Sequence, residues 1–142
     1  MPYFSDVRTI FIKNLKKFAV FKGRTDPKEH RLFCVFYSVL AGLLVTPAVL
    51  VLALFLMMNE GNFNHTAALI LIGVIAWSFI LTLPLASITV RRLHDINKSG
   101  WYFFICYVPG LGLIKMLEWT AQEGDAGDNR FGPNPKAVKE KL

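Results

Sequence analysis

The stretch LFCVFYSVLAGLLVTPAVLVLALFLMM, residues 32–58, contains 27 consecutive residues without a charged side chain. A second stretch, TAALILIGVIAWSFILTLPLASITV, residues 66–90, contains 25 more. About 20 predominantly apolar residues allow an α-helix to cross the ~30 Å hydrocarbon layer of a membrane. A soluble helix of similar length keeps a polar face, and neither stretch has one. We therefore predict membrane-spanning helices over residues 32–58 and 66–90.

The positive charge of the chain is distributed unevenly. The net charge is +6, and eight of the 16 lysines and arginines precede Leu32. Three more lie in residues 91–100, whereas the short polar connection over residues 59–65 has none. Cytoplasmic loops carry the excess of Lys and Arg in membrane proteins. We therefore expect the N-terminus and residues 91–100 to be cytoplasmic, where basic groups also suit anionic phospholipid headgroups.

Residues 1–31 are predicted to form a cytoplasmic amphipathic segment. At about 100° per residue, a helix over residues 3–21 separates an apolar arc from a lysine-rich face, the first made by Phe4, Val7, Phe11, Leu15 and Phe18, the second by Thr9, Lys13, Lys16 and Lys17. This pattern is typical of a helix lying in the membrane interface, and equally of a helix packed against the rest of the protein. Asp26 and Pro27 predict the start of the next helix. No cleavable signal peptide is expected, because 31 residues rich in charge precede the first apolar run.

The motif RRLHDINKSGW, residues 91–101, follows the second apolar run. If the helix continues through it, Arg91 and Asp95 are four residues apart and can form an ion pair. Arg92 points elsewhere and can reach a phosphate or a carboxylate. His94 and Asp95 diverge by about 100° on a helix, so they are not expected to act as a catalytic dyad.

A third apolar segment covers residues 101–119, with Ser99 as its expected N-cap. Pro109 and Gly110 interrupt it, and it is less apolar than the other two. We predict a short or broken third transmembrane helix. The alternative is a re-entrant hairpin, which returns the C-terminus to the cytoplasm. Residues 121–142 form a polar tail rich in Gly, Asn and Pro, which favour turns.

These patterns predict an all-α integral membrane bundle of three transmembrane helices, the third short or broken, with an N-terminal amphipathic interfacial helix. The expected organisation has three parts. Residues 1–31 form the cytoplasmic segment, residues 32–120 the transmembrane domain with its cytoplasmic motif loop over 91–100, and residues 121–142 the polar tail.

The motif and the tail together resemble a bacterial inner-membrane family known as domain of unknown function 805. Arg-Arg-Leu-His-Asp and Ser-Gly-Trp match residues 91–95 and 99–101, Gly-x-Asn-Arg-Phe-Gly-x-x-Pro matches residues 127–135, and Phe-x-Gly-Arg matches residues 21–24. Lys115 departs from the more apolar third segment that is usual in the family. The resemblance implies a small multi-pass protein of the bacterial inner membrane, and it implies no established activity.

The function we expect is that of a non-enzymatic scaffold or interaction protein in the lipid bilayer. Its basic cytoplasmic surface would bind an anionic lipid headgroup or a protein partner in the membrane or cytoplasm. The candidate surface consists of Arg24, Arg91, Arg92, His94, Asp95, Lys98 and Trp101, with Asn129 and Arg130 as secondary candidates. A purely structural role for the motif, in which it orients and caps the helix, accounts for the same residues.

Two other functions are weighed against this one. A subunit of an oligomeric transporter or channel would use the helix breaks at Pro47, Pro84 and Pro109, but the first two spans hold no charge to mark an ion path. A lipid-headgroup enzyme with His94 as its base lacks a nucleophile–base pair and a multi-carboxylate metal motif. We therefore predict no catalytic residue, cofactor or metal ion and no nucleic-acid partner, and we keep a homo-oligomer as a candidate assembly.

Overall fold

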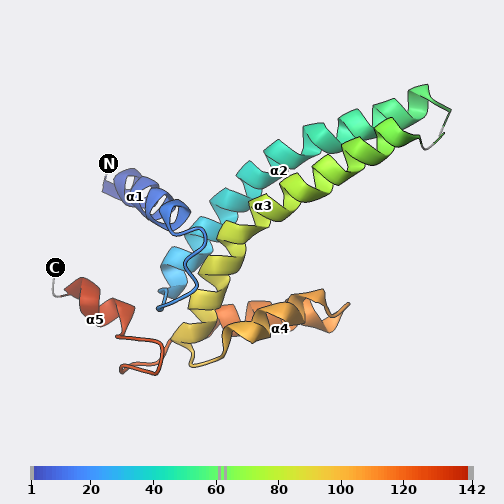
Figure 1. The fold of residues 1–142 in the computed structure, drawn as a ribbon. Helices are drawn as coiled ribbons and strands as arrows, with labels where there is room; N and C mark the ends of the chain where they lie inside the picture. Colours follow the sequence, from blue (N-terminus) through green and yellow to red (C-terminus); the bar gives the residue numbers. More distant parts are fainter. Residues whose placement is uncertain (1, 61, 63, 141–142) are drawn as a thin grey trace. The chain divides into compact units, whose positions relative to one another are not determined.

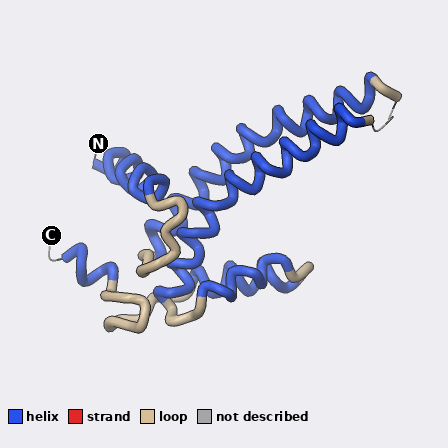
Figure 2. The backbone as a smooth tube through the Cα atoms, viewed as in Figure 1, coloured by secondary structure: helices blue, strands red, loops and turns tan. Residues whose placement is uncertain are grey.

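A computed structural model describes the backbone of residues 2–60, 62 and 64–140, and the burial of side chains over residues 7–60, 62 and 64–137. Over these ranges the chain is helical and contains no β-strand beyond one isolated bridge (Figure 2). The elements are α1 (Pro2–Lys16), α2 (Pro27–Met58), α3 (His65–Asp95), the 3₁₀ helix η1 (Gly100–Tyr107), α4 (Leu111–Ala121) and α5 (Pro135–Glu140).

The chain divides into two compact units. One unit contains Val35–Leu83, and the other combines Met1–Cys34 with Pro84–Leu142. The organisation predicted from the sequence separates an N-terminal segment, a membrane domain and a tail. In space, the N-terminal segment, the motif and the tail belong to the same unit, which is therefore assembled from segments far apart in the chain.

The unit Val35–Leu83 consists of the adjoining parts of α2 and α3. The two helices run side by side, as Figure 1 shows, and the Tyr37 hydroxyl donates a hydrogen bond to the Leu81 carbonyl oxygen at 2.9 Å. The two helices are therefore antiparallel neighbours.

The apolar side chains of α2 and α3 face outward. Both helices are long and apolar enough to cross a membrane, yet only 0% and 6% of their most apolar windows are buried inside the protein. Large side chains along both helices are more than half exposed, among them Leu43, Leu54, Leu69, Ile72 and Phe79. Soluble monomers rarely expose contiguous apolar patches beyond a few hundred Å², so this surface is suited to hydrocarbon.

The segment before α2 differs in part from the sequence prediction. The start of α2 at Pro27 is confirmed, and the Lys28 N–H approaches Asp26 Oδ1 at 3.4 Å. The predicted helix over residues 3–21 is too long, because α1 ends at Lys16. Hydrogen bonds between residues three apart, such as the one from Lys17 N to Asn14 O, close the last turn of α1. Gly23 then adopts a left-handed φ of +92°.

The end of α3 is closed by a capping arrangement of the Schellman type. Asn97 adopts a left-handed φ of +56°. Its N–H donates to the His94 carbonyl oxygen at 3.1 Å, and the N–H of Lys98 donates to that of Leu93 at 2.9 Å. The helix thus continues through residues 91–95, as predicted, and the chain then turns sharply.

The third apolar segment is not one helix. Ser99 caps η1, as predicted, with its hydroxyl 3.5 Å from the Trp101 N–H. The chain breaks at Pro109 and Gly110, also as predicted, but the break reverses its direction. The ring of Tyr102 lies edge-on to that of Trp119, with centroids 5.4 Å apart, so η1 and α4 form a hairpin. The third segment is therefore broken, as predicted, and its two short arms fold back on each other.

Candidate functional site

The motif at the end of α3 lies inside its unit. Arg91, Arg92, Leu93, His94 and Asp95 are all buried, and Arg92 has no exposed surface. A buried charge is costly unless another charge pairs with it and hydrogen bonds satisfy its polar atoms. The partners of these side chains therefore indicate what the motif does.

Asp95 holds two arginines at once. Its Oδ1 accepts a hydrogen bond from Arg24 Nε at 2.8 Å, and its Oδ2 pairs with Arg92 NH1. All three side chains are almost fully buried. The carboxylate thereby links the loop before α2 to the end of α3.

The same two arginines also hold the chain that follows α4. Arg92 donates through Nε to the Thr120 carbonyl oxygen at 3.1 Å and through NH2 to that of Gln122. Arg24 donates to the carbonyl oxygens of Asp125 at 2.7 Å and of Gly127 at 2.6 Å. These bonds engage all three nitrogens of each guanidinium group with partners from the protein itself.

Arg91 belongs to a second buried network, with α1 and α2. Its NH2 donates to Asn14 Oδ1 at 3.1 Å, and Asn14 Nδ2 donates to Glu29 Oε1 at 2.8 Å. Lys13 adds an ion pair to Glu29 at 3.1 Å. The amide of Asn14, which has no exposed surface, therefore bridges a carboxylate and a guanidinium.

Among the residues whose burial is described, the buried charges of this unit are balanced. The positive charges are the three guanidinium groups of Arg24, Arg91 and Arg92. The negative charges are the three carboxylates of Asp26, Glu29 and Asp95. A balanced cluster attracts an external anion far less than a cluster of free arginines. We call these six side chains the charged core.

This arrangement gives Arg91 another partner than the helical spacing predicted. Arg91 pairs with Asn14, not with Asp95, because Asp95 is already engaged by Arg24 and Arg92. Five of the seven residues of the predicted interaction surface have buried side chains, namely Arg24, Arg91, Arg92, His94 and Asp95. Arg92 does reach a carboxylate, as expected, but that carboxylate is internal.

The tail covers His94, and the two secondary candidates take part. The ring of Phe131 stacks on that of His94 with centroids 3.8 Å apart. Asn129 Nδ2 donates to the His94 carbonyl oxygen at 2.9 Å, and Arg130 donates to that of Asn97 at 3.1 Å. Asn129 and Arg130 therefore fasten the tail to the motif.

Two histidines next to the apolar runs have lowered pKa values. His30 precedes the apolar run that begins at Leu32. Burial lowers its pKa to about 4, and the positive charges of Arg92, Arg31 and Arg91 lower it further. Its Nδ1 is buried without a hydrogen-bond partner. Burial also lowers the pKa of His94, although its hydrogen bond to the Gly23 carbonyl oxygen opposes the shift.

Lys98 and Trp101 remain accessible. Trp101 is 79% exposed. The ammonium of Lys98 lies 5.5 Å from the ring centre of Tyr102 and 4.8 Å from that of Trp119, within the range of cation–π attraction. These two members of the predicted surface therefore belong to the base of the η1–α4 hairpin.

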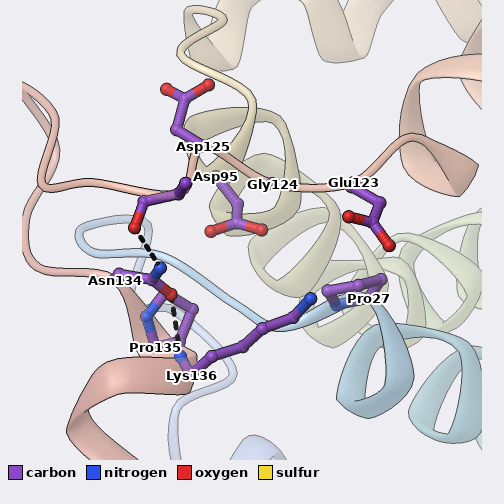
Figure 3. A pocket seen from close by; sticks show the side chains of 9 residues that line it. Pro27, Asp95, Glu123, Gly124, Asp125, Asn134, Pro135 and Lys136 are labelled. Atoms are coloured by element: carbon purple, nitrogen blue, oxygen red, sulfur yellow. Dashed lines mark hydrogen bonds between the residues drawn. The ribbon is translucent and has the colours of Figure 1, made fainter.

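A small pocket lies between the charged core and the tail (Figure 3). The carboxylates of Asp95 and Glu123 turn toward it, whereas that of Asp125 turns away. Gly124 forms part of its wall, and a Cβ at this position would collide with the Asp95 carboxylate. The described residues contain no group of three or more His, Cys, Asp or Glu side chains arranged to hold a metal ion.

Asn14, Glu29 and Gly124 were missed by reasoning from the sequence. Only Asn14 gave a signal, since it is a polar residue at the edge of the apolar arc of α1. Glu29 reads as part of a charged collar before the first span, and Gly124 as one more glycine of a turn-rich tail. Their roles depend on contacts between segments.

Comparison with known proteins places these features in a family. The chain is 28% identical over 126 residues to the Escherichia coli protein named "Inner membrane protein YhaH", which covers 89% of this chain and 95% of the relative. It is 29% identical over 126 residues to the E. coli "Inner membrane protein YhaI", covering 89% and 94%. No solved structure matches. The model of the family described as "Protein of unknown function (DUF805)" matches residues 18–133, which include the charged core and most of the tail, and the chain therefore belongs to the DUF805 family.

Proposed function

We propose that this protein is a bacterial inner-membrane protein that crosses the bilayer twice, through α2 and α3. The outward-facing apolar side chains of both helices carry this proposal, because their burial in hydrocarbon avoids exposing them to water. The names of the E. coli relatives support the same location.

The N-terminal segment, the motif and the tail lie on one side of the membrane in this proposal. Arg24, Asp95 and Gly127 are joined by hydrogen bonds of 2.6–2.8 Å, so no hydrocarbon layer separates them. The excess of Lys and Arg before Leu32 supports the cytoplasmic side for all three.

On that side, the protein acts as a non-enzymatic scaffold that binds anionic phospholipid headgroups. The binding groups are not those of the charged core, which is electrically balanced. They are the exposed basic side chains of residues 16–31 that make no ion pair with the described residues, namely Lys16, Lys17, Lys22, Lys28 and Arg31. We call these five residues the basic surface.

The neighbourhood of the basic surface supports a lipid rather than a soluble anion. Phe18, Val20 and Phe21 lie between its lysines and are 40–49% exposed. Apolar side chains flanked by lysines suit a surface with acyl chains below and negative headgroups above. Each Lys or Arg near such a surface contributes about 1 kcal/mol of attraction.

The test uses the full-length protein in mixed micelles with a dansyl-labelled phosphatidylglycerol, and energy transfer from tryptophan reports binding. The triple variant K16Q/K17Q/K22Q should bind about 100-fold more weakly, since about 1 kcal/mol is lost for each of the three lysines. The matched control K136Q/K139Q/K141Q removes the same charge from the tail and should bind like the wild type.

Two outcomes would overturn the proposed lipid binding. One is equal affinity of wild type and K16Q/K17Q/K22Q for the phosphatidylglycerol probe. The other is equal affinity of the wild type for dansyl-labelled phosphatidylcholine, since a basic surface has no electrostatic preference for a zwitterionic headgroup.

A further inference from the structure

The two ends of the η1–α4 hairpin are held at the same place. Its entry lies beside the end of α3, where the ammonium of Lys98 faces the rings of Tyr102 and Trp119. Its exit is held by Arg92, which donates to the carbonyl oxygens of Thr120 and Gln122. A segment whose ends meet leaves a membrane on the side from which it entered.

The arms of the hairpin are packed tightly against each other. Gly112 begins the contact, because a Cβ there would collide with the backbone carbonyl oxygen of Ile105. Gly112, Met116 and Thr120 form the buried side of α4. The two arms therefore form one folded element.

Each arm is too short to cross a bilayer. The 11 residues of α4 extend about 16 Å at ~1.5 Å per residue. The 8 residues of η1 extend about 16 Å at ~2.0 Å per residue. Both lengths are about half of the ~30 Å hydrocarbon layer.

The outer side of α4 has an apolar and a charged part. Leu113, Ile114 and Leu117 are each more than 60% exposed. Lys115 and Glu118 form an ion pair at 2.8 Å and are about half exposed. At 100° per residue the pair faces roughly a third of a turn away from the three apolar side chains, so one part can enter acyl chains while the other meets headgroups.

We propose that the η1–α4 hairpin lies in the cytoplasmic leaflet, at the boundary between headgroups and acyl chains, and that phospholipid acyl chains cover Leu113, Ile114 and Leu117. The inference rests on the membrane location proposed above. The exposed ion pair argues for a shallow position, because paired charges near the middle of the bilayer remain costly. The neighbouring aromatic side chains Trp101, Tyr102 and Tyr107 suit the same depth.

Nitroxide spin labels on single cysteines test this position, in full-length protein that carries C34A and C106A and is reconstituted in phospholipid vesicles. Labels replace Leu113, Leu117 and Lys115, and accessibility to oxygen and to a water-soluble nickel complex gives their depth. We expect the oxygen-to-nickel ratio to be severalfold higher at L113C and L117C than at K115C.

Two controls separate the possible failures. I75C, in the exposed apolar part of α3, must be oxygen-accessible, and high nickel accessibility there would contradict the membrane location itself. K136C and K22C in the tail and N-terminal segment should both react with an impermeant maleimide only from the cytoplasmic face.

Three results would overturn the inference while I75C behaves as expected. Nickel accessibility at L113C equal to that at K115C would place the hairpin in water. Exclusion of both reagents from L113C would indicate cover by protein, such as a second copy of the chain. Labelling of K136C from the opposite face to K22C would make the hairpin a span.

Discussion

Arg24 and Asp95 are 71 residues apart in the chain, and Nε of the arginine lies 2.8 Å from Oδ1 of the carboxylate. This ion pair joins the segment before α2 to the end of α3. The same arginine holds the tail through the Gly127 carbonyl oxygen. One buried side chain thus brings together three parts of the chain that the sequence separates.

Replacing Asp95 by Asn should destabilise the unit that contains the charged core. Two buried guanidinium groups, Arg24 and Arg92, would lose their common carboxylate, and breaking a buried ion pair typically costs about 3–5 kcal/mol. The thermal unfolding midpoint in detergent should fall, and trypsin should cleave the tail faster. The control E118Q breaks the exposed pair with Lys115, which is worth ~1 kcal/mol at most, and an equal fall in both variants would contradict the role of Asp95.

Replacing Gly124 by Ala should release the tail without removing a charge. The new methyl group would collide with the Asp95 carboxylate. Gly127 provides a control in the same tail, since a Cβ there meets nothing within 4 Å. Proteolysis at Lys136 should accelerate in G124A and stay unchanged in G127A. Indistinguishable cleavage of G124A and wild type would show that the tail does not depend on this close approach.

Replacing Asn14 by Leu should detach α1. The substitution keeps the branched shape of the side chain but removes the hydrogen bonds to Glu29 and Arg91, and hydrogen bonds to charged groups contribute about 1.5–3 kcal/mol each. Cleavage by trypsin after Lys16 and Lys17 should become faster as α1 separates. The exposed Asn62 offers a matched control, and N62L should leave the cleavage pattern as it is in the wild type.

Acid should weaken the fold through His30. Its pKa is about 4 in the folded protein and 6.5 in the unfolded chain, so the unfolded state binds more protons between these values. The contribution to stability is complete above pH 6.5 and is lost as the pH falls toward 4, by about 2 kcal/mol at pH 5. The difference in unfolding midpoint between pH 7 and pH 5 should therefore shrink in H30Q and stay the same in H65Q, whose histidine is exposed. A pH dependence in H30Q as steep as in the wild type would exclude this mechanism.

Local signals in the sequence were sufficient for several elements. Asp26 and Pro27 mark the start of α2, and Ser99 marks that of η1, because capping involves residues adjacent in the chain. Pro109 and Gly110 mark the break before α4 for the same reason. The length of α1 was overestimated, since its apolar spacing continues beyond the last helical turn.

The partners of the motif could not be predicted in this way. Arg91 at four residues from Asp95 satisfied the helical spacing rule, yet competing partners from distant segments took both side chains. The tail pattern was recognised beside the motif, but the stacking of Phe131 on His94 was not.

Uncharged runs of 27 and 25 residues are a property of composition and length, so they alone identify helices suited to a bilayer. Charge pairing depends on which segments meet, and that depends on the complete packing of the unit. Only the tertiary structure therefore decided that the arginines of the motif are internal, that Asn14 bridges Arg91 and Glu29, and that the third apolar segment folds back on itself.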